Sequence, residues 1–133
     1  MTNDEIDEQT ALKIMGWTRK PGHEVWTDFN GKVTKWGTPD CIRLNDVTTS
    51  FYWEPSTNIE AAFEMAEKMR GDNQDLGFQL EIEPGFSHWV AEWCEYHDQT
   101  PCPQRYACGR GETPELAICN VSLEWVKKYG DKP

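Results

Sequence analysis

The 133-residue sequence predicts an α+β layered domain in which a mainly antiparallel sheet is covered by three helices. Two observations lead to this class. Helical hydrophobic patterns occur near both ends and in the middle of the chain, and short alternating segments joined by brief turns lie between them. The length suits a single domain that spans residues 1–133.

The first helix is predicted over residues 3–16. Ile6, Leu12 and Met15 supply its apolar positions, and acidic residues come early, where they interact favourably with the helix dipole. Gly16 is expected to end the helix, because glycine readily adopts the left-handed conformation of a helix C-terminus.

Residues 18–54 combine turn signals with aromatic side chains. The Asn30-Gly31 pair predicts a hairpin between short strands at residues 25–29 and 32–36. Residues 42–44 and 49–53 are two further candidate strands, to which the sequence assigns no order.

The middle helix is the most clearly marked element. Thr57 and Glu60 have the spacing of a capping box, in which each side chain bonds the backbone N–H of the other residue. Gly71 is expected to end this helix. Its predicted buried face consists of Ile59, Ala62, Phe63, Ala66 and Met69.

Three strands and a final helix follow. Residues 78–82 alternate between apolar and polar, and a turn at Pro84-Gly85 leads to a long aromatic strand at 86–96. A shorter strand is expected at 105–108. Thr113 is a favourable N-cap for the last helix, whose predicted buried face consists of Leu116, Cys119, Leu123 and Val126.

Three segments share their order and spacing with one family: residues 14–17 (IMGW), 55–63 (PSTNIEAAF) and 113–119 (TPELAIC). Together they resemble the phage ABA sandwich domain family, small proteins of tailed phages and prophages, over about residues 10–126. Asn58 and Phe63 differ from the family's Asp and Trp, and residues 120–122 replace an alanine-rich stretch. The resemblance implies an α-β-α sandwich and a phage origin, and it implies no reaction.

The composition argues against several classes of protein. A net charge of -10, with 23 acidic against 13 basic residues, argues against direct nucleic-acid binding. No apolar run approaches the ~20 residues of a membrane helix. The acidic N-terminus and the odd number of cysteines favour a reduced protein in the host cell cytoplasm. Most of the seven tryptophans, together with Cys41 and Cys119, are expected in the core.

The cysteine-rich segment allows two interpretations. Cys94, His97, Cys102 and Cys108 offer zinc-binding atoms at the spacing C-x2-H-x4-C-x5-C. This is not the familiar knuckle spacing, and Cys94 lies in a predicted strand, so a plain hairpin is preferred and no metal or cofactor is assigned. A Cys102–Cys108 disulfide is disfavoured in a reducing compartment.

No motif for catalysis occurs. The chain has neither a glycine-rich phosphate loop nor a G-x-S-x-G sequence, so no catalytic residue is assigned and no enzyme is expected.

Two predicted helix starts, with nearby aromatic and basic residues, form a candidate ligand site. Helix N-termini bind anions, aromatic rings stack on bases, and guanidinium groups bind phosphate. The alternative for these residues is an ordinary role as helix caps and core aromatics. The predicted binding residues are Trp17, Tyr52, Trp53, Ser56, Thr57, Asn58, Arg105, Arg110 and Thr113.

The leading prediction is a non-catalytic, phage-encoded anti-defence protein that sequesters a small anionic ligand such as a nucleotide signal. The first alternative is an acidic, DNA-mimic-like inhibitor of a basic host protein. A continuous stripe of Asp4, Glu5, Asp7 and Glu8 with other carboxylates would favour that alternative. The second alternative is a small zinc protein, and a homo-oligomer is compatible with all three.

Overall fold

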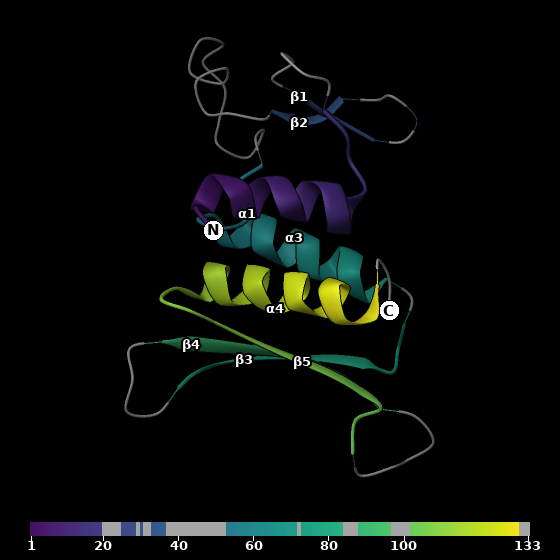
Figure 1. The fold of residues 1–133 in the computed structure, drawn as a ribbon, viewed down its shortest axis with the longest axis vertical. Coiled ribbons are helices and arrows are strands. Elements are labelled where there is room, and N and C mark those ends of the chain that lie inside the picture. Colours follow the sequence, from purple (N-terminus) through teal and green to yellow (C-terminus); the bar gives the residue numbers. More distant parts are fainter. Residues whose placement is uncertain are drawn as a thin grey trace.

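The computed structural model describes residues 1–19, 25–28, 30, 33–36, 53–71, 73–83, 88–96 and 102–130. Within these ranges the chain forms three helices and five strands, in the order α1, β1, β2, α3, β3, β4, β5 and α4 (Figure 1). A π-helical segment, η1, continues α1. The predicted α+β class, with three helices and an antiparallel sheet, is confirmed.

Each helix begins at a side chain that accepts a hydrogen bond from its first turn. The helices are α1 (Asn3–Thr10) with η1 (Ala11–Met15), α3 (Ile59–Arg70) and α4 (Pro114–Tyr129). Their N-caps are Thr2, Asn58 and Thr113. Gly16 ends the first helix with a φ of 73°, the left-handed conformation that glycine adopts without steric cost.

The strands form two separate antiparallel sheets. The larger sheet has the order β3-β4-β5 and consists of β3 (Leu76–Ile82), β4 (Trp89–Glu95) and β5 (Arg105–Gly111). β1 (Val25–Thr27) pairs with β2 (Val33–Trp36), in agreement with the predicted hairpin strands. The candidate strand at 42–44, and residues 49–52 of the next one, lie outside the described residues.

The described helices lie on one face of the larger sheet. α4 packs directly against the sheet, and α1 and α3 pack against α4 on its far side (Figure 1). The other face of the sheet carries Gln79 and Glu92, which are paired in the register, and no described helix covers it. The sheet is therefore an outer layer of the described structure, and the described helices cover one of its faces.

Two glycines allow α4 to approach the backbone of β5. A Cβ added at Gly109 would lie 2.2 Å from the Val121 nitrogen, and one added at Gly111 would lie 2.6 Å from the Leu116 Cβ. Both distances are far shorter than van der Waals contact, so a larger residue at either position would force the helix away from the strand.

The core is rich in tryptophan, as expected. Cys119 is fully buried, and burial raises the pKa of its thiol. The tryptophans that are at most 7% exposed are Trp17, Trp26, Trp53, Trp93 and Trp125.

None of the described helices has both the length and the apolar character that crossing a bilayer requires.

The predicted capping box of the middle helix is wrong. The N-cap is Asn58, whose Oδ1 accepts a hydrogen bond from the Ala61 N–H at 3.1 Å. Thr57 lies one residue earlier, in a turn closed by its N–H to the Glu54 carbonyl at 3.1 Å. The extended conformation of Asn58 and the reach of its amide place the cap one residue later than the T-x-x-E pattern indicates.

Two apolar residues of the predicted helices are exposed, and one of them, Phe63, was expected on a buried face. Phe63 is 45% exposed and Leu12 is 42% exposed. α3 packs through smaller residues such as Ala62 and Ala66, which permit a close approach. Leu12 lies in η1, where the π-helical turn rotates the side chains away from the positions of a regular α-helix.

Candidate functional site

Trp17 and Trp53, predicted to stack on a ligand, pack against each other. Their ring centroids are 4.8 Å apart and the rings are inclined at 73°, an edge-to-face arrangement. The Trp53 indole N–H donates to Thr10 Oγ1 at 3.0 Å, and the two tryptophans are 7% and 1% exposed. Both rings therefore belong to the core. Tyr52 lies outside the described residues.

A half-buried carboxylate connects α1 to the segment that precedes α3. The Ser56 N–H donates to Asp7 Oδ1 at 2.9 Å. The buried Ser56 hydroxyl lies beside the same carboxylate but makes no hydrogen bond of good geometry within the described residues. Burial raises the pKa of Asp7 to about 6 in spite of the Ser56 N–H, because burial disfavours the charged form. Ser56 is thus directed at α1, whereas Thr57 is exposed.

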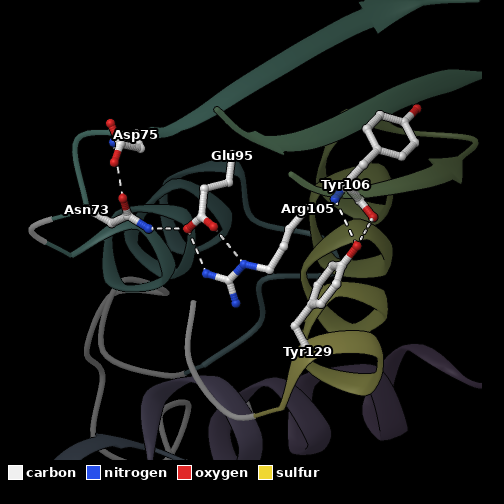
Figure 2. Close-up of polar contacts among 6 residues, drawn as sticks. All are labelled: Asn73, Asp75, Glu95, Arg105, Tyr106 and Tyr129. Atoms are coloured by element: carbon white, nitrogen blue, oxygen red, sulfur yellow. Dashed lines mark hydrogen bonds and ion pairs between the residues drawn. The ribbon is translucent and has the colours of Figure 1, made fainter. Parts of the chain in front are cut away.

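Arg105 binds a carboxylate of the protein itself. Its Nε and Nη2 donate to the two carboxylate oxygens of Glu95 at 2.7 and 2.6 Å, and the Asn73 amide donates to the same carboxylate at 2.6 Å (Figure 2). Only 3% of Glu95 is exposed, so the arginine neutralises a charge that would be costly to bury alone. Hydrogen bonding to Glu95 raises the pKa of Arg105.

The remaining predicted residues do not converge with Arg105. The Arg105 guanidinium lies 5.4 Å from the ring centre of Tyr129, the last residue of α4. Thr113 caps the first turn of α4, and a 16-residue helix spans about 24 Å. Arg110 pairs with Glu83 at 3.2 Å at an exposed position, and this interaction raises the pKa of Arg110. Arg105 and Thr113 therefore lie at opposite ends of α4.

The cysteine-rich segment contributes two neighbouring strands, as the hairpin interpretation requires. Cys94 lies on β4, where it pairs in the register with Tyr106 of β5, and Cys108 follows on β5. Among the residues that the structure describes, no three His, Cys, Asp or Glu residues are placed to hold a metal. His97 lies outside the described residues. Burial raises the pKa of Cys94, which reduces its thiolate fraction at neutral pH.

A groove between α1, α4 and the edge of β5 has a volume of about 630 Å³. This volume is within the range of small-molecule sites. Its apolar lining comes from Met1, Leu123 and Val126, and two residues of β5, Cys108 and Gly109, also line it. The groove therefore combines an apolar surface with the edge of the sheet.

The polar lining makes the groove locally basic on an acidic protein. Lys13 of η1 and Lys127 of α4 are balanced by a single carboxylate, that of Glu124, whereas the whole chain has 23 acidic and 13 basic residues. Gln9 and Asn120 add amides that both donate and accept hydrogen bonds. The groove is complementary to a small anion that also has a flat or apolar part.

The groove was not predicted from the sequence, because segments far apart in the chain form it. One signal exists on each helix: Gln9 and Lys13 are four residues apart, and Asn120, Glu124 and Lys127 recur at helical spacing, so each set lies along one helix face. Nothing in the sequence indicates that the two faces adjoin each other and the edge of β5.

Comparison with known proteins identifies the family. The family model described as the Phage ABA sandwich domain matches residues 9–123 of this 133-residue chain. No curated protein and no solved structure matches the chain. The match extends from within α1 to within α4, so it includes the whole three-stranded sheet and most of the groove. The chain belongs to the phage ABA sandwich domain family, as the three sequence segments indicated.

Proposed function

We propose that this phage-family protein is a non-catalytic binding protein that captures a small anionic ligand of the nucleotide class in the groove. The observation that carries the proposal is the placement of Lys13 and Lys127 around a cavity of about 630 Å³ on a protein of net charge -10. An anion is repelled by most of such a surface and attracted at this place. The proposal shifts the ligand from the predicted tryptophans and helix starts to the groove.

The lining matches the parts of a nucleotide. Lysine ammonium groups bind phosphate as point charges, and Lys13 and Lys127 are both exposed, so they are accessible to a ligand. Leu123 and Val126 supply apolar surface for a base or a ribose, and Gln9 and Asn120 supply hydrogen bonds that fix its orientation. Charge, size and polarity thus favour the same class of ligand.

Capture alone would suffice for an anti-defence role in the host cytoplasm. A protein that holds a signalling nucleotide lowers its free concentration in proportion to affinity and abundance, so no bond need be made or broken. The geometry supports this mode because the groove has the size of a small-molecule site, whereas the cysteines considered as zinc ligands form no metal-binding group within the described residues.

An interaction with a basic host protein is less well supported, because the acidic stripe that would favour it is interrupted on the first helix. Asp7 is turned toward the Ser56 backbone, and Glu8 pairs with Arg19 at 3.5 Å. Asp4 and Glu5 remain exposed. The acids of α1 therefore do not form one continuous anionic surface.

Isothermal titration calorimetry with AMP, GMP, CMP, UMP and cyclic nucleotides tests the proposal. We expect saturable binding of at least one nucleotide, weakened about tenfold or more by the variant Lys13→Glu or Lys127→Glu, because a charge reversal replaces attraction by repulsion. The matched control is Lys68→Glu, a change of the same charge at an exposed position of α3 that does not line the groove. No heat with any nucleotide, or equal losses in all three variants, would refute the proposal.

A further inference from the structure

Along the outward edge of β5, some backbone N–H and C=O groups are hydrogen-bonded and others are not. In an antiparallel strand, alternate residues direct their N–H and C=O groups away from the paired strand. On β5 these residues are Tyr106, Cys108 and Arg110. The intervening residues of β5 form backbone hydrogen bonds with alternate residues of β4, namely Trp89, Ala91, Trp93 and Glu95. The outward groups of these three residues decide what the edge can bind.

Side chains of α4 occupy the edge on both sides of Cys108. The Tyr106 N–H donates to the Tyr129 hydroxyl at 2.9 Å (Figure 2), and the Tyr106 carbonyl accepts from the same hydroxyl at 3.1 Å and from Lys128 Nζ at 2.8 Å. At the other end, Asn120 Nδ2 donates to the Arg110 carbonyl at 2.7 Å. In the described part of the chain, no group hydrogen-bonds the outward N–H and C=O of Cys108.

Cys108 is also the strand residue that lines the groove, together with the neighbouring Gly109. The following inference rests on the function proposed above. We propose that the outward N–H and C=O of Cys108 form paired hydrogen bonds with the donor–acceptor edge of a nucleobase. The phosphate of the same nucleotide lies near Lys13 and Lys127. Every nucleobase offers a donor beside an acceptor on one edge. The backbone pair would therefore select nucleotides over phosphates that lack a base.

The pattern of occupied groups favours a compact ligand over an extended peptide. A peptide that adds a strand to a sheet edge needs alternate residues of that edge free along several positions. Here the positions before and after Cys108 are already bonded to Tyr129, Lys128 and Asn120, so strand addition would have to break those bonds. A single free pair fits one base edge.

A backbone substitution tests the proposal. Cys108→Pro removes the outward N–H and leaves the bonds to β4 intact, because proline is tolerated on an edge strand where its nitrogen faces outward. Cys108→Ala keeps the N–H and removes the thiol, and Arg110→Pro removes an outward N–H that does not line the groove. All variants are compared with wild type in calorimetry with the most tightly bound nucleoside monophosphate and with ribose 5-phosphate, after circular dichroism confirms the fold.

We expect Cys108→Pro to weaken the nucleotide about threefold to tenfold, the worth of one neutral hydrogen bond, and to leave ribose 5-phosphate unchanged. Arg110→Pro should bind like wild type, and Cys108→Ala, which keeps the N–H, should bind the nucleotide more tightly than Cys108→Pro. Equal affinity of wild type for the nucleotide and for ribose 5-phosphate would overturn this inference while leaving anion capture in place, whereas no binding of either would refute the proposed function itself.

A second measurement covers the case in which the proline variant does not fold. In ¹⁵N-labelled wild-type protein, the Cys108 amide resonance should shift on titration with the nucleotide and stay in place with ribose 5-phosphate. Equal shifts with both ligands, or no shift with the nucleotide under saturating conditions, would contradict base recognition at Cys108.

Discussion

The Arg105 guanidinium holds the Glu95 carboxylate through two hydrogen bonds, of 2.7 and 2.6 Å, at a place where only 4% of the glutamate side chain is exposed. The pair connects the end of β4 to the start of β5. The ring centre of Trp125 in α4 lies 5.1 Å from the guanidinium carbon. This geometry indicates that Arg105 stabilises the fold, although the sequence suggested a role in phosphate binding.

Replacing Arg105 tests that assignment. Arg105→Ala would leave the buried Glu95 carboxylate with one fewer charged partner, and we expect the free energy of unfolding to fall by about 2–3 kcal/mol in urea titrations at pH 7. Arg110→Ala is the control, because its ion pair with Glu83 is largely exposed and should contribute little. Unchanged stability of Arg105→Ala, combined with lost nucleotide binding, would return Arg105 to the ligand site.

The close approach of α4 to β5 predicts a strong effect at Gly109. In Gly109→Ala the new methyl group would overlap the Val121 backbone, so we expect a loss of at least about 2 kcal/mol in thermal or urea unfolding. Gly77→Ala is the matched strand control, since its nearest atom would be the Cys94 carbonyl oxygen at 3.8 Å, an ordinary contact. Similar stabilities of the two variants would contradict the observed helix–strand packing.

The raised pKa of Asp7 predicts a pH dependence of stability. The folded-state pKa of about 6 lies above the ordinary 3.8, so the folded protein binds this proton more tightly than the unfolded chain does. The stability from this group is therefore complete below pH 4 and is lost as the pH rises from about 4 to about 6. Allowing for partial exposure of the carboxyl, the loss should be about 1–2 kcal/mol.

Asp7→Asn supplies the comparison. The amide oxygen can still accept the Ser56 N–H but does not titrate, so urea unfolding measured from pH 4 to pH 7 should lose this part of the pH dependence. The variant should also be more stable than wild type at pH 7. A pH profile that matches wild type would show that Asp7 does not cause the effect.

The N-cap of α3 predicts a difference between two adjacent residues. Asn58→Ala removes the acceptor for the Ala61 N–H and should destabilise the protein by about 1 kcal/mol in thermal unfolding. Thr57→Ala should change stability much less, because Thr57 is exposed and precedes the cap. The reverse order of effects would support the capping box that the sequence suggested.

Local chemistry in the sequence predicted the helices well, because their ends depend on neighbouring residues. Thr113 caps α4 and Gly16 ends the first helix, as expected from their backbone preferences. Burial was predicted less well. Phe63 is exposed because α3 packs through its alanines. Leu12 is exposed because the helix changes to π geometry at that position. Both results depend on tertiary packing, which the spacing of apolar residues does not describe.

The candidate site was the least predictable feature. Trp53 and Ser56 have the residue types of a ligand site, but tertiary contacts with Thr10 and Asp7 place them in the interior. The free hydrogen-bonding pair at Cys108 depends on strand register and on side chains that reach the edge from α4. Neither property is encoded in a local motif.

The central claim is that a nucleotide binds in the groove, and chemical-shift mapping in ¹⁵N-labelled protein tests it most directly. Titration with the nucleotide that gives the largest heat should shift the backbone amides of Lys13, Asn120 and Lys127 and leave those of Ser56 and Thr57 in place. Shifts confined to the start of α3, or the absence of any shift at saturating nucleotide, would contradict the account.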